Sequence, residues 1–144
     1  MNKQKHIFLL FFVLSFFIIS CNENVESYFT NYQELNSGGY LSNGWIPKVI
    51  PDNSYEIREI HNLDNNHVFG TFKYRSDSFD KIIDNLEKVD KVELEKLLQE
   101  INFPKRPEWF LDSQMLIGNE LNFYRYDNFI LIVNQKEKQV YFVN

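Results

Sequence analysis

Hydrophobic and polar residues alternate with a period of two in two neighbouring segments near the middle of the chain. The first segment covers residues 55–62, and the second covers residues 67–74. Such alternation is typical of strands whose two faces have different surroundings. The intervening residues 63–66 read Leu-Asp-Asn-Asn and favour a turn, because Asn and Asp tolerate left-handed backbone angles. The pattern therefore predicts a β-hairpin over residues 55–74.

A helical period replaces this alternation after the hairpin. Apolar residues recur at i, i+3, i+4 and i+7 from Phe79 and again from Leu94, which predicts two amphipathic helices. Asp90 and Glu93 have the spacing of a capping box, so we expect the second helix to begin after Asp90, with a bend between the helices.

A third helix is predicted near the N-terminus. Tyr28, Tyr32 and Leu35 have i, i+4, i+7 spacing, which favours a short helix over residues 25–36. The Gly-Gly pair at residues 38–39 would end this helix in left-handed geometry.

The C-terminal third of the chain contains three apolar segments, residues 121–126, 129–134 and 139–143. The last two are apolar on both faces, so we expect them to pair at the sheet centre and to be covered on both sides. The predicted fold class is α+β. It is a single small domain in which an antiparallel sheet, made of the N-terminal-half hairpin and the C-terminal strands, packs with two to three amphipathic helices.

The segment that leads into the hairpin reads GWIPKVIP over residues 44–51. Together with the turn at residues 63–66, it resembles an uncharacterised group of bacterial lipoproteins that includes those with a YbbD head-like domain. The matching positions are Gly44, Trp45, Ile46, Pro47, Ile50, Pro51 and Ile57. The chain departs from the group at Asn53-Ser54, where the group has Ser-Ala, and at Asn65, where it has Thr. The resemblance implies an α+β envelope domain and supplies no catalytic residue.

The start of the chain has the pattern of a bacterial lipoprotein signal. Two lysines and a histidine precede an apolar run over residues 7–19, which is short for a membrane span. Residues 18–21, Ile-Ile-Ser-Cys, resemble a lipobox, in which the cysteine receives lipid such as palmitate. We expect a signal peptide over residues 1–20, lipidated Cys21 and a tether over residues 21–27, and one domain over residues 28–144. The alternative is a signal-anchor helix that ends at a cysteine by chance.

Charge and cysteine content narrow the classes of partner. The formal net charge is −5, and it becomes −7 for residues 21–144 because Lys3 and Lys5 lie in the signal peptide. This acidic balance argues against nucleic acid and permits a basic protein partner. Cys21 is the only cysteine, so no disulfide can form within the chain. We therefore place the protein in the bacterial cell envelope, lipid-anchored on the periplasmic side or at the outer membrane.

The candidate chemistry is sparse. His61 and His67 flank the predicted turn with Asp64 between them, an arrangement that is weak as a metal site and more typical of surface histidines. We expect no metal, no cofactor and no catalytic residue, and we interpret acid pairs such as Glu56 with Glu59 as surface residues. Trp45 is expected to be a core anchor, with partner binding as its alternative role.

Three functions are compatible with these features. The first is a lipid-anchored protein-interaction module, in its specific form an immunity or inhibitor protein, with Trp45, His61, Asp64 and His67 as candidate partner-binding residues. The second is an envelope enzyme with a dispersed site that acts on cell-wall material. The third is a structural envelope lipoprotein. A cleft around His61 and Asp64 would favour the enzyme, whereas an exposed patch would favour the binding module.

Overall fold

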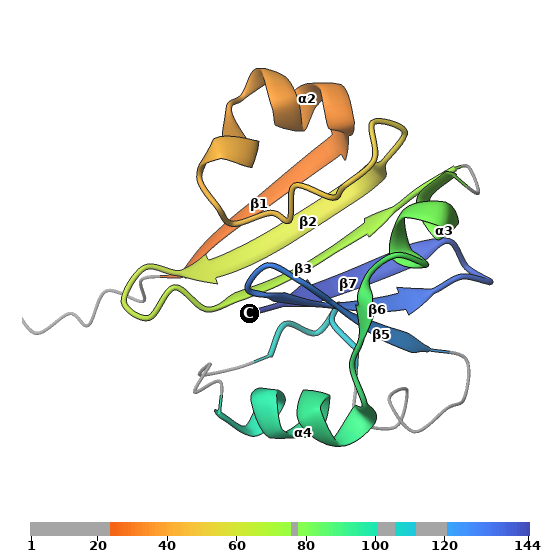
Figure 1. Ribbon diagram of the computed structural model, residues 1–144. Helices are drawn as coiled ribbons and strands as arrows, with labels where there is room; N and C mark the ends of the chain where they lie inside the picture. The colour runs from red at the N-terminus through yellow and green to blue at the C-terminus, as the bar shows by residue number, and fades with distance from the viewer. Residues whose placement is uncertain (1–23, 76–77, 101–105, 112–120) are drawn as a thin grey trace, which may run out of the picture.

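The computed structural model describes residues 24–75, 78–100, 106–111 and 121–144 (Figure 1). The strands are β1 (Asn24–Asn31), β2 (Tyr55–Asn62), β3 (Val68–Lys73), β4 (Glu87–Lys88), β5 (Asn122–Tyr126), β6 (Phe129–Asn134) and β7 (Gln139–Val143). The helices are α2 (Tyr32–Ser37), the 3-10 helix η1 (Tyr40–Ser42), α3 (Ser78–Ile83) and α4 (Lys91–Glu100). Cys21 and the first part of the predicted tether, through residue 23, lie outside the described residues.

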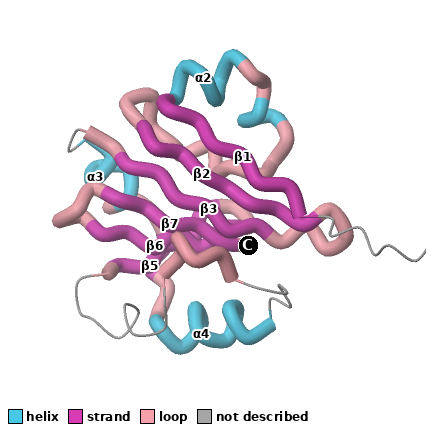
Figure 2. The backbone as a smooth tube through the Cα atoms, turned by 180° about the vertical axis from the view of Figure 1, so that it is seen from behind, coloured by secondary structure: helices cyan, strands magenta, loops and turns pink. Residues whose placement is uncertain are grey.

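All seven strands form one antiparallel sheet, in the order β1-β2-β3-β7-β6-β5-β4 (Figure 2). The predicted hairpin is β2 and β3, and the predicted C-terminal strands are β5, β6 and β7. β7 lies at the centre, between β3 and β6, which confirms the expected position of the last strand. The α+β fold class is therefore confirmed, with one open sheet and helices packed against it.

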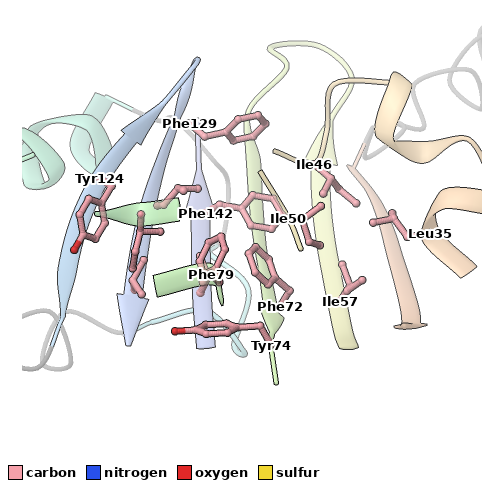
Figure 3. Packing of buried hydrophobic residues seen from close by; sticks show 14 of the residues in the cluster. Leu35, Ile46, Ile50, Ile57, Phe72, Tyr74, Phe79, Tyr124, Phe129 and Phe142 are labelled. Atoms are coloured by element: carbon pink, nitrogen blue, oxygen red, sulfur yellow. The ribbon is translucent and has the colours of Figure 1, made fainter. Parts of the chain in front are cut away.

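Each face of the sheet carries its own hydrophobic cluster. The side covered by α2, α3 and the connection 43–54 is called here the α2 face, and Figure 3 shows its packing. Its buried residues include Leu35, Ile46, Ile50, Ile57, Phe72, Tyr74, Phe79, Leu131, Val133, Val140 and Phe142. The opposite side, the α4 face, is covered by α4 and residues 106–111. Its buried residues are Phe69, Val89, Leu94, Phe110, Leu111, Ile130, Ile132 and Val143.

β7 joins the two halves of the sheet through close packing as well as hydrogen bonds. Phe142 is the register partner of Gly70 in β3 and of Leu131 in β6. Its ring lies so close over Gly70 that a Cβ atom built there would be 1.9 Å from Cζ of Phe142. Gly70 thus provides the space that lets the Phe142 ring lie flat across the centre of the α2 face.

The helix predicted over residues 25–36 is wrong in its first half. Asn24–Asn31 is strand β1, which pairs along its length with β2, and the strand also takes in part of the predicted tether. The helix begins only after Asn31, whose side chain accepts a hydrogen bond from the Glu34 backbone N–H at 3.0 Å. A strand followed directly by a helix produced the i, i+4, i+7 spacing that we interpreted as one helix.

The region between the two later helices also differs in detail. α3 ends at Ile83, and the short strand β4 then pairs with β5 at the edge of the sheet. The predicted cap of α4 is confirmed, because the Asp90 carboxylate accepts a hydrogen bond from the Glu93 N–H at 2.8 Å. In place of the predicted bend, the chain between α3 and α4 forms the edge strand β4.

Candidate functional site

The central feature of the α2 face is a buried carboxylate–imidazole pair on β2. Glu59 and His61 point to the same face because alternate residues of a strand do so. Nδ1 of His61 lies 3.0 Å from Oε2 of Glu59, and the residues are only 6% and 1% exposed, respectively. The indole of Trp45 stacks on the imidazole, with a ring separation of 4.1 Å and an interplanar angle of 4°. Trp45 comes from the connection before β2, so it covers the pair from outside the sheet.

Burial dominates the electrostatics of Glu59. Desolvation raises the pKa of this carboxyl above its ordinary value, because the interior disfavours the charged form. Hydrogen bonds from His61 and Ser27 act in the opposite direction and lower it, and Glu26 adds a smaller repulsion. Since both Ser27 and His61 bond to the carboxylate, the three residues do not form a chain from nucleophile to base to acid. The arrangement supplies a buried carboxyl group with hydrogen-bond partners rather than activating a hydroxyl.

The interpretation of Glu59 as a surface residue is wrong. Its pleat position places it beside Ile57, inside the α2 face. The other acid of that predicted surface pair, Glu56, is exposed as expected. The signal for Glu59 was present in the alternation of β2, where Ile57, Glu59 and His61 share one face.

The structure separates the four residues proposed for partner binding. Trp45 and His61 lie together, whereas Asp64 is exposed in the turn between β2 and β3. His67 is turned toward the chain end, with Nδ1 3.1 Å from the carbonyl oxygen of Asn144. Within the described part of the chain, no group of three His, Cys, Asp or Glu residues could hold a metal ion. The predicted core role of Trp45 fits its position, because it is partly buried against the α2-face cluster.

A second feature lies on the α4 face, over the half of the sheet that α4 does not reach. Here a shallow, open groove of about 250 Å³ is lined by Tyr28, Glu56, Arg58, Thr71, Lys73, Trp109 and Gln139. These residues come from β1, β2, β3, β7 and the segment 106–111, and we call this feature the Trp109 groove. Its floor is a row of register partners, because Tyr28 pairs with Arg58 and Arg58 with Thr71.

Hydrogen bonds and ion pairs hold the groove in shape. Glu26 accepts from Arg58 Nε at 2.7 Å and from Trp109 Nε1 at 3.0 Å with the same carboxylate oxygen. The Arg58 guanidinium also lies over the Trp109 ring, 5.1 Å from its centroid. Lys73 pairs with Glu56 at 2.7 Å, and this hydrogen bond raises the pKa of Lys73, which keeps it charged. The groove is therefore polar and charge-balanced, with aromatic rings at its edges.

Sequence reasoning missed this groove. Its members are spread along the chain from residue 28 to residue 139, and no local motif links them. The period-two pattern of β2 places Arg58 on the face of the sheet opposite to that of Ile57. Only the pairing of strands brings Tyr28 and Thr71 beside Arg58. Trp109 reaches the groove because residues 106–111 fold back over the sheet, with the Phe110 N–H donating to the Pro107 carbonyl.

The first three strands, which carry both features, coincide with a known family. Residues 23–73 match the model of the YbbD head domain. The chain carries a YbbD head-like domain. The YbbD head-like segment begins at β1 and ends with β3, so it includes the Glu59–His61 pair and most of the Trp109 groove. Trp109 and Gln139 are supplied by residues that follow the segment.

The match supports a bacterial envelope protein. The chain matches no curated protein and no solved structure. Within the ranges that the structure describes, no helix is long and apolar enough to cross a membrane.

Proposed function

We propose that this protein is a lipid-anchored protein-interaction module of the bacterial cell envelope, attached through Cys21 and binding its partner at the β1 side of the sheet. The observation that carries the proposal is the position of Tyr28. Its side chain is 58% exposed, and it lies on the outermost strand at the end of the Trp109 groove. Large aromatic residues exposed beside preorganised polar groups are typical of protein-binding surfaces.

The anchor and the surface are compatible in space. β1 begins three residues after Cys21, so a lipid on that cysteine would hold the start of β1 within about 10 Å of the membrane surface. The anchor supplied by two or more acyl chains is stable, because each buried CH₂ contributes about 0.8 kcal/mol. The partner in this proposal is a protein that meets the module at the membrane surface.

A narrower form of the proposal is an immunity or inhibitor protein for a secreted toxin. It is supported by the small size of the domain and by the net charge of −7 over residues 21–144, which favours a basic partner. Identifying the protein that crosslinks to the β1 side, in the experiment described below, would distinguish an immunity or inhibitor protein from a general envelope module. The buried Glu59–His61 pair does not favour the enzyme alternative, since neither side chain opens into the groove.

The test is photo-crosslinking in living cells that carry the complete precursor. A photoreactive phenylalanine derivative replaces Tyr28 in one strain and Ile82 in the control strain. Ile82 is matched because it is also a large apolar residue, 40% exposed, but lies on α3 at the other side of the sheet. We expect one discrete protein adduct from position 28 and none from position 82. Equal labelling at both positions, or none at position 28, would contradict a binding surface beside β1.

A further inference from the structure

We infer that β1 is a docking edge to which a basic partner protein adds an extended segment, continuing the seven-stranded sheet by one strand. The inference rests on the proposed function, and it specifies how the partner binds and what chemistry it has. Strand addition supplies affinity through main-chain hydrogen bonds and specificity through the flanking side chains.

Among the described residues, the backbone of β1 pairs with β2 on one side and with no strand on the other. In β2, the Asn62 N–H donates to the His67 carbonyl on the β3 side, so the even-numbered residues of β2 direct their backbone groups toward β3. The backbone groups of the odd-numbered residues of β2 therefore point toward β1. Glu59 is one of these residues, and its register partner in β1 is Ser27, so the odd-numbered residues of β1 bond to β2. It follows that the N–H and C=O groups of Glu26 and Tyr28 point away from the sheet.

A side chain closes the far end of this edge. The Thr30 N–H, which points outward like that of Tyr28, donates to Oε2 of Glu34 in α2 at 2.7 Å. This is the way natural sheets protect an edge from unwanted pairing. Within the ranges that the structure describes, no other side chain caps an outward N–H of β1, so the open run covers residues 24–28, which is about 17 Å of strand. The edge is suited to a short strand of four or five residues.

Exposed apolar side chains gather on both faces of this open run. Tyr28 lies on the α4 face, and Val25, 40% exposed, lies on the α2 face. On that same face, the Tyr40 ring packs edge-on against Phe29 with a centroid separation of 4.6 Å and remains 36% exposed. An added strand would place its side chains beside Tyr28 and Val25, because side chains of neighbouring strands lie next to each other on each face, and Tyr40 lies just beyond the end of the open run. Alternating side chains of the incoming segment would thus find apolar contacts on each face.

The negative charge of the domain favours a basic segment as the strand that pairs with β1. The Glu34 carboxylate lies at the edge, whereas the Glu26 carboxylate is paired with Arg58, and the domain as a whole is acidic, with a net charge of −7 over residues 21–144. A second copy of the chain would bring the same carboxylates and the same net charge to the edge, and like charges oppose association. In a segment in which basic and apolar residues alternate, the basic residues would complement the acidic domain, and the apolar residues would contact the exposed apolar side chains beside β1.

The experiment uses the intact lipoprotein in detergent micelles and a short labelled peptide in which Lys and Val alternate. The matched probe alternates Glu and Val. Fluorescence anisotropy measures binding, and amide hydrogen exchange reports the protection of Glu26 and Tyr28. We expect the Lys–Val peptide to bind at least about tenfold more tightly than the Glu–Val peptide and to slow exchange at these two amides.

A pair of variants separates the backbone contribution from the side chain. Tyr28→Pro removes an outward N–H without touching the bonds to β2, and proline is tolerated in edge strands for this reason. Tyr28→Val removes the ring but keeps the N–H, and valine favours a strand. We expect Tyr28→Pro to weaken peptide binding about tenfold relative to Tyr28→Val. If Tyr28→Pro does not fold, the exchange protection in the unmodified protein carries the test alone.

Three results would overturn the inference. They are peptide binding without protection of Glu26 and Tyr28, equal binding of both peptides, and concentration-dependent protection without peptide, which would identify a second copy as the occupant. A discrete adduct at position 28 in cells, combined with unprotected edge amides, would leave the proposed function standing and reject strand addition.

Discussion

The Glu59 carboxylate lies 3.0 Å from Nδ1 of His61 in the interior of the α2 face, and Trp45 closes the site by stacking on the imidazole. Burying a carboxylate is costly unless hydrogen bonds replace its water. Here His61 and Ser27 supply those bonds. The pair therefore links β1, β2 and the connection that precedes β2, and its loss should affect the whole YbbD head-like segment.

Replacing Glu59 by alanine should destabilise the domain by about 2–4 kcal/mol, because the change leaves a cavity and buried polar groups without their partner. Denaturant unfolding of the lipid-free chain at neutral pH provides the measurement. The matched control is Glu95→Ala, at an exposed position on α4 where the carboxylate pairs with Lys91 at the surface, which should cost less than about 1 kcal/mol. Equal costs for both variants would show that the Glu59–His61 pair does not stabilise the sheet.

The stability of the unmodified domain should also depend on pH through Glu59. Its pKa is raised in the folded state by burial, so the folded protein holds this proton at pH values where the unfolded chain has lost it. The resulting stabilisation is complete below the ordinary pKa, near 4.5, and is lost as the pH rises through the raised value. Relative to Glu59→Gln, which cannot titrate there, the unmodified protein should therefore lose stability on going upward from about pH 4. Parallel pH profiles for the two proteins, measured by urea unfolding, would contradict the assignment.

The close packing of Gly70 and Phe142 gives a prediction about the sheet centre. Gly70→Ala should destabilise the domain by about 1–3 kcal/mol or more, because its Cβ would overlap the Phe142 ring. Combining it with Phe142→Leu, which shortens the opposing side chain, should cost less than the sum of the two single changes. Thermal unfolding of the four proteins gives the coupling. Additive effects would mean that the ring moves aside at no cost.

Removing residues 139–144 should prevent soluble folding, although chain ends are usually dispensable. The deletion takes out β7, the strand between β3 and β6, and leaves two apolar strands with unpaired edges in the middle of the sheet. It also removes Asn144, whose side chain accepts a hydrogen bond from the Val68 N–H at 2.9 Å. Expression of the truncated chain followed by size-exclusion chromatography is the measurement. A soluble product with a cooperative unfolding transition would contradict the central role of β7.

Lipid attachment is tested at Cys21. The lipobox-like residues 18–21 predict that Cys21→Ser abolishes acylation and leaves the signal peptide uncleaved by the lipoprotein peptidase. Metabolic labelling with a fatty-acid analogue compares the variant with the unmodified precursor. Ser20→Ala serves as a control, because a small residue before the cysteine is retained and labelling should persist. Equal labelling of the Cys21→Ser variant would reject the lipoprotein assignment.

The sequence by itself determined the elements whose signals are local. The bounds of β2, β6 and β7 follow from apolar alternation or runs between turn residues, and the cap at Asp90 follows from a spacing of three residues. Even the central position of β7 was predictable, because a strand that is apolar on both faces must be covered on both faces. These features depend on residues close together in the chain, and so the pattern specifies them.

Tertiary structure decided the rest. Residues 24–31 are a strand only because β2 offers them hydrogen-bonding partners, and their own spacing was equally compatible with a helix. Glu59 is buried because Ser27, from a separate strand, and His61 bond to its carboxylate while Trp45 covers the His61 ring, whereas the residue type alone indicates the surface. The Trp109 groove and the open edge of β1 likewise exist only after distant strands have paired. Local preference fixes which segments are regular, but burial and pairing across the chain fix which side chains form a site.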